Sequence, residues 1–523
     1  MKPAKPLIIS LALMLLIIGF SQAGWPIGAS ARQASNSDLR RPNVLFIMGD
    51  DHAPYAIGAY GNKLARTPSL DKLAARGVRF NRAYANSPVC TPSRQSIITG
   101  KLPHAAGVTL LATPLAEEQL TIAEHLKTFS YRTGAIGKMH FNSNLKHGFD
   151  YRVDRPDHRR WLKERQDSGK ARSVAADVRV KPQWRPFRDP ARIWLNADAL
   201  PIGQYDEDAE GTFFARKAIE FLEQKSDQPF CLWLSFYEPH SPFDFPIEYA
   251  GMFDPKKTQV GKLGPEDSRQ IPKVFSDLTE EEKQGIVAAY YTSVAYLDKN
   301  IGLTLDAIKR LKLDENTLVV YVGDHGYNLG HHGRFEKHGF WETAVRAPLI
   351  MSYPQQFKGG RAVNGLVEFV DLMPTILDVC GVSHPDGLQG HSLTPLLEGK
   401  TSKGRDYVFS EYLFGWEEAM IRTEEWKFIY TKGSIDRADG YETAYPKPGK
   451  SKRLYNVLKD PDEMTNLANR PEYRKIVEQL QQKLYERLIN THPKAKDLPR
   501  GLSQEEVIDM LLQPLEGKQA ERP

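Results

Sequence analysis

Asn43-Val-Leu-Phe-Ile-Met-Gly-Asp-Asp51 is the stretch of sequence that decides the fold. Its apolar run, closed by a glycine and two carboxylates, is typical of a strand buried on both faces. Thr317-Leu-Val-Val-Tyr-Val-Gly-Asp-His325 has the same form later in the chain. Buried strands of this kind occur in parallel sheets that helices cover on both sides. We therefore predict an α/β fold around a large, mixed but mostly parallel sheet.

Helical and strand-like segments alternate around these two runs, as expected for such a sheet. The predicted helices cover residues 67–76, 93–99, 121–129, 209–224 and 280–310. The predicted strands cover residues 78–83, 134–137 and 230–237. We expect a break in the longest helix near Gly302, because glycine is a weak helix former.

The pattern changes after about residue 399. Strand-like runs at 408–412, 419–422, 426–430 and 453–456 precede a helical segment at 471–490. Short consecutive strands joined by turns favour an antiparallel sheet. We predict a main domain at 40–398, a C-terminal α+β subdomain at 399–495 that this helix closes, and a polar tail at 496–523 with a helix at 504–512.

The first residues resemble a targeting segment. Lys2 and Lys5 precede an apolar run at 7–20, which is shorter than the ~20 residues that span a bilayer. Small residues at 21–23 fit a cleavage site. We predict a signal peptide at 1–23, with cleavage as late as residue 31. The protein is then exported, periplasmic or secreted, without stable membrane association after cleavage. An uncleaved membrane anchor is the alternative.

Composition limits the choice of partners. The 523 residues include 70 basic and 65 acidic side chains, a net charge of +5. This is too mild for a nucleic-acid binder, and three cysteines cannot form a disulfide framework. Residues 155–192 nevertheless hold twelve Lys or Arg against five Asp or Glu. They form either a solvated surface segment or an insertion near a pocket that attracts an anionic polymer.

Carboxylates follow both of the strands that decide the fold. Asp50, Asp51, Asp324 and His325 would meet at the carboxyl edge of a parallel sheet, where ligands bind. Clustered carboxylates repel one another unless a cation neutralises them, and oxygen ligands favour Ca²⁺ or Mg²⁺. His325 is a softer ligand and keeps a transition metal open. The alternative is that each aspartate only caps a turn.

Val89-Cys-Thr-Pro-Ser-Arg94 is the most specific motif in the chain. Its Cys-x-Pro-x-Arg pattern resembles the maturation motif of the type I sulfatases, which belong to the alkaline phosphatase superfamily. Further stretches resemble that family in the same order along the chain, at residues 41–51, 67–71, 77–80, 99–104, 137–140, 238–240, 323–326, 330–337 and 454–467. The resemblance implies an alkaline-phosphatase-like catalytic domain.

The resemblance also implies the site. A maturation enzyme would oxidise Cys90 to formylglycine, whose hydrate attacks sulfur. Many members carry Asn where this chain has His325, and the Asp-His version resembles the iduronate-2-sulfatase-like and choline-sulfatase-like branches. We expect one divalent metal, Ca²⁺ with Mg²⁺ as the alternative. Its implied ligands are Asp50, Asp51, Cys90, Asp324 and His325.

The remaining implied residues handle charge and protons. Arg94 would stabilise the hydrated aldehyde, and Lys138 and Lys337 would neutralise sulfate oxygens. His140 fits the base that reopens the hydrate. His240, together with Lys337, fits the acid that protonates the leaving alcohol.

We therefore expect a sulfuric ester hydrolase that acts on a sulfated saccharide. A phosphonate or phosphate ester hydrolase of the same superfamily is the nearest alternative, since both ester types are tetrahedral anions. A pseudoenzyme that binds sulfated glycans without turnover is a second alternative. A secreted zinc phosphatase is a third, but it would need a richer set of ligands for two metals.

Overall fold

The computed structural model describes residues 41–183, 190–413, 417–432 and 450–515. The predicted signal peptide at 1–23 and the later cleavage site lie outside these residues. From Arg41 onward the chain forms one compact unit. Among the described helices, none has both the length and the apolar character needed to cross a membrane.

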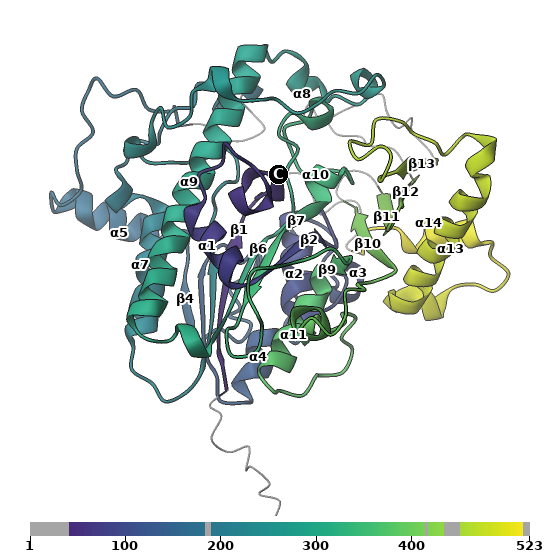
Figure 1. Ribbon diagram of the computed structural model, residues 1–523, viewed down its shortest axis with the longest axis horizontal. Coiled ribbons are helices and arrows are strands. Elements are labelled where there is room, and N and C mark those ends of the chain that lie inside the picture. The colour runs from purple at the N-terminus through teal and green to yellow at the C-terminus, as the bar shows by residue number, and fades with distance from the viewer. Residues whose placement is uncertain (1–40, 184–189, 414–416, 433–449, 516–523) are drawn as a thin grey trace, which may run out of the picture. The chain divides into compact units, whose positions relative to one another are not determined.

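A nine-stranded sheet forms the centre of the fold (Figure 1). Its strands are β1 (Asn43–Gly49), β2 (Val78–Tyr84), β3 (Arg132–Gly137), β4 (Tyr151–Val153), β5 (Phe230–Ser235), β6 (Thr317–Gly323), β7 (Arg346–Ser352), β8 (Arg361–Val363) and β9 (Val367–Glu368). The order is β4-β3-β5-β1-β6-β7-β2-β8, with β9 also on β2. All pairs are parallel except those that β7 makes with β6 and β2. The predicted mixed, mostly parallel sheet is confirmed.

Strand β7 was not predicted from the sequence. Pro348 interrupts its apolar run, and proline inside a run counts against a strand. In the structure, Pro348 lies where the register between β2 and β7 shifts, between the pairs Phe80–Leu349 and Ala83–Ala347. Such an irregularity is where a strand tolerates a missing N–H donor.

Helices cover both faces of the sheet because β1 is apolar on both sides. Leu45 and Ile47 belong to the core that includes α1 (Pro68–Arg76), α7 (Glu210–Glu223) and α9 (Glu280–Arg310). Val44 and Phe46 belong to the core that includes α2 (Cys90–Thr99), α4 (Ile122–Lys127) and α11 (Leu372–Val379). Figure 1 shows α7 and α9 on one side of the sheet and α2 and α11 on the other. Helix α9 runs through Gly302 without the expected break.

A four-stranded antiparallel sheet follows, as predicted. Its strands are β10 (Tyr407–Tyr412), β11 (Glu417–Thr423), β12 (Trp426–Lys432) and β13 (Ser451–Asn456). Helices α13 (Arg474–Thr491) and α14 (Gln504–Leu511) pack on this sheet through one apolar cluster. The first part of the predicted tail is therefore packed, with Val507 and Ile508 buried. The remaining helices are α3 (Pro103–Ala106), α5 (Arg155–Asp167), α6 (Ala191–Trp194), α8 (Lys273–Ser276), α10 (Glu342–Val345) and α12 (Thr394–Leu397).

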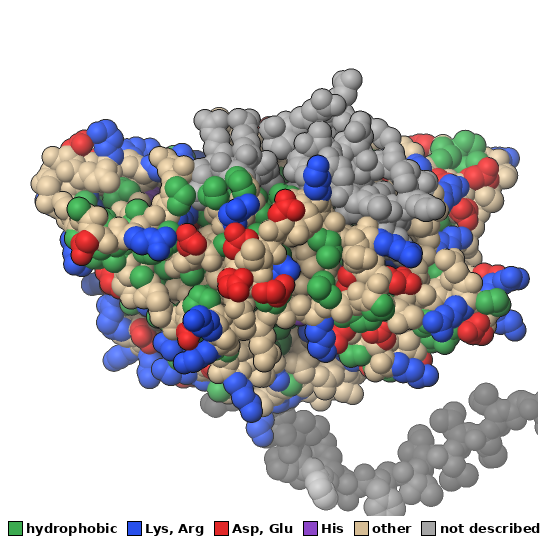
Figure 2. All heavy atoms as spheres, turned by 90° about the horizontal axis from the view of Figure 1, so that it is seen from above, with side chains coloured by type: hydrophobic (Ala, Val, Ile, Leu, Met, Phe, Trp, Pro, Cys, Tyr) green, Lys and Arg blue, Asp and Glu red, His purple; other side chains and the backbone are tan. Residues whose placement is uncertain are grey.

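The basic segment at 155–192 begins with helix α5. Most of its described basic side chains pair with acidic groups of this chain: Arg155–Glu210, Arg160–Asp157, Lys163–Asp167, Arg165–Asp208, Arg172–Glu248, Arg179–Asp198, Lys181–Asp244 and Arg192–Glu282. Figure 2 shows basic and acidic side chains interspersed over the face in view. This pairing favours the solvated-surface interpretation over an anion-attracting field.

Candidate active site

Four neighbouring parallel strands deliver the predicted residues to one edge of the sheet. They are β3, β5, β1 and β6, in that order across the sheet. Gly49 and Gly323 are register partners, so the residues that follow β1 and β6 leave the sheet side by side. The groups beyond these four strand ends are Lys138 after β3, His240 after β5, Asp50 and Asp51 after β1, and Asp324 and His325 after β6.

Gly137 allows the turn that carries Lys138 into the site. Its φ is +84°, and a Cβ there would lie 2.0 Å from the Ser235 carbonyl oxygen. Only glycine fits both conditions. The next residue, Lys138, donates its backbone N–H to that same carbonyl at 2.9 Å. The lysine is therefore fixed at the junction of β3 and β5.

Cys90 is the first residue of α2 and lies at the centre of the site. Its Sγ is 3.3 Å from His325 Nε2, 3.1 Å from Lys337 Nζ and 3.9 Å from Lys138 Nζ. Every residue of α2 is buried. Burial raises the pKa of the Cys90 thiol far above its usual range, and nearby Asp50 adds to that rise. The residue is thus a protonated thiol surrounded by charge.

Four side chains form a group that fits a metal ion. Potential ligand atoms of Asp50, Cys90, Asp324 and His325 all lie within 4.8 Å of one another. His325 Nδ1 is 2.9 Å from the Gly326 carbonyl, to which it donates, because a carbonyl only accepts. The other ring nitrogen, Nε2, faces the cluster. Two carboxylates and an imidazole nitrogen suit a divalent cation.

Cations compensate the buried aspartates. Arg94 donates from Nε to Asp324 at 2.9 Å and lies 3.3 Å from Asp50. Lys138 pairs with Asp50, and Lys337 Nζ lies 2.7 Å from Asp51. Burial alone would raise the pKa of Asp50, but Lys138 and the neighbouring cations hold it well below its usual value. Lys337 acts in the same way on the pKa of Asp51, which is also lowered.

The two predicted proton carriers lie at this edge as neutral imidazoles. His240 donates from Nδ1 to the Ser241 carbonyl at 2.6 Å, and its Nε2 lies 3.9 Å from Asp51 Oδ2. Burial, helped by the charge of Lys337, lowers the pKa of His240 to about 4. Burial and Lys138 also lower the pKa of His140 well below its usual value.

Three residues that support the site were not singled out from sequence. Thr91 and Gln95 contact the segment at 138–140 from helix α2. Ser235 accepts a hydrogen bond from Arg94 Nη1 at 2.7 Å. Helical spacing from Arg94 could have indicated Thr91, three residues before it, and then Gln95, four residues after Thr91, because residues three and four apart share a helix face.

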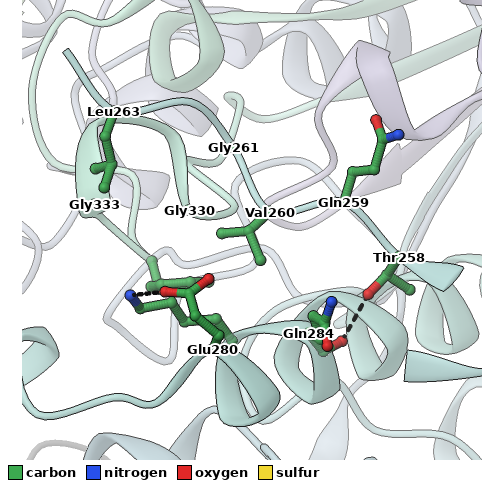
Figure 3. Close-up of a pocket in the computed structure, with 11 residues that line it drawn as sticks. Thr258, Gln259, Val260, Gly261, Leu263, Glu280, Gln284, Gly330 and Gly333 are labelled. Atoms are coloured by element: carbon green, nitrogen blue, oxygen red, sulfur yellow. Dashed lines mark hydrogen bonds and ion pairs between the residues drawn. The ribbon is translucent and has the colours of Figure 1, made fainter. Parts of the chain in front are cut away.

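A separate cavity lies at the N-terminal end of α9 (Figure 3). Its volume is about 480 Å³, and its lining comes from residues 258–263, from the first turns of α9, and from Gly330, Gly333 and Phe335. Phe335, which lines the cavity, lies two residues before the site residue Lys337. None of the predicted site residues lines this cavity.

Comparisons with known proteins match nearly the whole described chain. A family model described as Sulfatase matches residues 42–382, and one described as N-sulphoglucosamine sulphohydrolase, C-terminal, matches residues 330–490. An N-acetylglucosamine-6-O-sulfatase of Bacteroides thetaiotaomicron is 28% identical, with 88% of each chain covered. An ulvan-active sulfatase of Formosa agariphila is 30% identical, over 86% of this chain and 81% of that protein.

One solved structure extends the likeness of fold beyond sulfatases. A phosphonate monoester hydrolase of Agrobacterium radiobacter superposes with a TM-score of 0.72 at 24% identity. The match covers 85% of this chain and 95% of that one. At this identity the match shows a shared architecture, and the chemistry has to be argued from the site.

Proposed function

The chain belongs to the sulfatase family, hydrolases that act on sulfuric ester bonds, and from that premise we propose that it releases inorganic sulfate from a sulfated saccharide. A relative of similar length is named for a 6-O-sulfated N-acetylglucosamine. The positive charges at the site support the anionic part of this substrate: Lys138 and Lys337 contact Cys90, and Arg94 pairs with Asp50.

The position and state of Cys90 carry the proposal. A thiol with a raised pKa is a poor nucleophile, because the thiolate is the reactive form. Conversion of Cys90 to formylglycine by a maturation enzyme removes this obstacle, since a hydrated aldehyde supplies a hydroxyl nucleophile. The first position of α2 also suits an anion, because N–H groups at a helix start have no partner within the helix.

The metal that we propose is Ca²⁺, with Mg²⁺ as the alternative. Asp50, Asp324 and His325 would hold it together with the converted residue 90, and Asp51, which groups with Cys90 and His240, would be a further ligand. Such an ion supplies Lewis-acid polarisation of a sulfate oxygen. Asp324 is placed for this role by its own hydrogen bonds, since it accepts the backbone N–H groups of Asp51 and His325, each at 3.0 Å.

The other site residues divide the remaining work. Lys138 and Lys337 bind sulfate oxygens as ammonium groups, and the pKa of Lys337 is raised by Asp51 despite its burial. His140 accepts a proton, and His240 with Lys337 returns one to the leaving alcohol. Bound sulfate adds negative charge beside His240, which favours its protonated form.

We also propose that the protein acts outside the cytoplasm, in the periplasm or the medium. Lys2, Lys5 and the apolar run at 7–20 support an export signal. Export favours an extracellular sulfated polysaccharide or its oligosaccharides as the substrate over a cytosolic metabolite.

The mass of the tryptic peptide 83–94, taken from protein made in its own host, tests the proposal. Conversion replaces the sulfur and two hydrogens of Cys90 with one oxygen, so the expected result is a lighter peptide. A wholly unmodified peptide in active enzyme would overturn the formylglycine mechanism. If that enzyme were inactive and bound sulfated glycans, the pseudoenzyme interpretation would replace it.

A matched panel of aryl sulfates and aryl phosphates separates the two ester chemistries. Faster turnover of the sulfates is the expected result. Preference for phosphates or phosphonates would instead support the nearest alternative, whose fold this chain shares. Sulfated mono- and oligosaccharides then test the saccharide part of the proposal.

A further inference from the structure

Helix α2 presents one face to the segment that carries Lys138 and His140. Thr91, Arg94 and Gln95 stand at positions i, i+3 and i+4, which share a helix face. Arg94 donates to the Lys138 carbonyl, and Gln95 Nε2 donates to the His140 carbonyl at 2.7 Å. Thr91 is the member of this face that contacts a side chain of the segment, since its Oγ1 lies 3.1 Å from His140 Nδ1.

Thr91 donates its hydroxyl proton to a backbone carbonyl and not to His140. Thr91 Oγ1 lies 2.7 Å from the Leu111 carbonyl oxygen. Two oxygens at this distance share a proton, and a carbonyl can only accept it. A hydroxyl has a single proton, so toward His140 the Thr91 oxygen is an acceptor. Its partner, His140 Nδ1, must therefore carry the ring proton.

From this arrangement we propose that Thr91 is a positioning residue that holds His140 in the Nδ1–H tautomer and leaves Nε2 as the atom that accepts a proton during turnover. The inference rests on the proposed function, in which His140 is the base. Nε2 makes no hydrogen bond to a described residue, and His140 as a whole is partly exposed. A base oriented through its second nitrogen is a common arrangement for catalytic histidines.

The backbone of His140 shows that this orientation is constrained. Its φ is +56°, a left-handed conformation that side-chain-bearing residues rarely adopt. Gln95 holds the carbonyl on one side of that residue, while Thr91 holds the ring on the other. Burial and Lys138 lower the pKa of His140, so the ring is neutral and its tautomer matters.

Thr91→Val and Thr91→Ser form the matched pair of variants that tests the proposal. Valine keeps the shape and removes the oxygen, whereas serine keeps the hydroxyl. Because Thr91 lies inside the maturation motif, each rate is divided by the converted fraction of residue 90, measured by peptide mass. We expect Thr91→Val to lower kcat about tenfold to a hundredfold with KM within about twofold, and Thr91→Ser to restore most of it.

A double-variant cycle shows whether Thr91 acts through His140. Thr91→Val should cost nothing further in a His140→Ala background. An equal loss in both backgrounds, or a wild-type kcat per converted enzyme for Thr91→Val, would overturn the proposal. Ring-nitrogen NMR spectra should show a protonated Nδ1 for His140 in the wild type and a mixture of tautomers in Thr91→Val. A wild-type ring spectrum in Thr91→Val would also overturn it.

Failure of the inference can be told apart from failure of the proposed function. If His140→Ala turned over like the wild type, the base role and this inference would both be wrong, while detection of formylglycine would still support the sulfatase mechanism. If peptide 83–94 were unconverted in active enzyme, the proposed function itself would fail.

Discussion

At the scale of single residues, the site places buried cations around a cysteine thiol that stays uncharged. Cys90 lies within 4 Å of two lysine ammonium groups, at 3.1 Å and 3.9 Å, and burial keeps its sulfur protonated. Cys231 and Cys380 are also buried, but among core side chains. Environment therefore separates the cysteine with a chemical role from the two that pack.

Cys90→Ala should lose more than about a thousandfold in kcat while keeping the fold, because no nucleophile can then form at residue 90. Cys380→Ala is the matched control, since it removes an equally buried sulfur from the core and should keep its activity. Sulfate release and circular dichroism check both variants. Substantial turnover by purified Cys90→Ala would contradict the mechanism.

Asp324→Ala should lose both the metal and the activity. Asp324 lies in the group of potential metal ligands and also accepts from Arg94, so its removal takes a ligand and one of the two carboxylates that pair with Arg94. Metal content by elemental mass spectrometry checks the prediction. Asp378→Ala, which removes a half-exposed carboxylate paired with His384, is the control and should keep its metal. Equal metal content in Asp324→Ala and the wild type would show that the ligand assignment is wrong.

At the scale of elements, α9 carries two glycines that play different parts. A Cβ on Gly285 would lie 1.6 Å from the Ala197 carbonyl oxygen, which is backbone and cannot move aside. A Cβ on Gly302 would lie 2.6 Å from Ser69 Oγ, the end of a side chain that can rotate. The break expected at Gly302 does not occur. Helix α9 has buried residues on both sides of this glycine, and their packing outweighs the weak helix propensity of a single residue.

Gly285→Ala and Gly302→Ala should therefore change stability in opposite directions. Alanine is intrinsically better in a helix by about 1 kcal/mol. At residue 285 the overlap with a backbone carbonyl should outweigh this gain, for a net loss of about 1–3 kcal/mol. At residue 302 the Ser69 side chain can rotate away from the new methyl group, so most of the gain in helix propensity should remain. Thermal unfolding midpoints of the two variants and the wild type check the prediction, and a midpoint for Gly302→Ala below that of the wild type would refute it.

At the scale of the whole molecule, buried ion pairs join the small sheet to the main one. Lys427 of β12 is fully buried and lies 2.9 Å from Glu342 of α10 and 2.6 Å from Glu463. It also donates to the Phe340 carbonyl at 2.7 Å. Burial raises the pKa of Glu342 but Lys427 and Arg422 bring it well below its usual value, so the carboxylate is ionised. The lysine thus holds the segment that follows Lys337 against the small sheet.

Lys427→Met should destabilise the protein by about 3–5 kcal/mol, because it removes the buried cation that pairs with both Glu342 and Glu463. Lys452→Met on β13 removes a half-exposed ion pair with Glu505 and should cost less than about 1 kcal/mol. Denaturant unfolding followed by fluorescence measures both. Similar midpoints for the two variants would mean that the buried cluster does not join the sheets as described.

Much of the fold could be predicted from local pattern alone. The runs that became β1 and β6 are apolar on both faces, and burial of both faces leaves few alternatives to a covered parallel sheet. The run that became β7 was not recognised, because Pro348 obscures it and only its partners β2 and β6 show where the missing donor is tolerated.

By itself, the sequence determined the buried strands, the potential metal ligands at their ends and the Cys-x-Pro-x-Arg motif. Each of these is a short pattern that can be interpreted from neighbouring residues alone. Only the tertiary structure decided which distant groups meet: Lys337 with Cys90 and Asp51, Thr91 with His140, and the partners that neutralise residues 155–192. Such pairings depend on strand order and helix packing, which bring together residues from separate elements. The tautomer of His140 also depends on the tertiary structure, because it follows from the hydrogen bond that Thr91 donates to the carbonyl of Leu111.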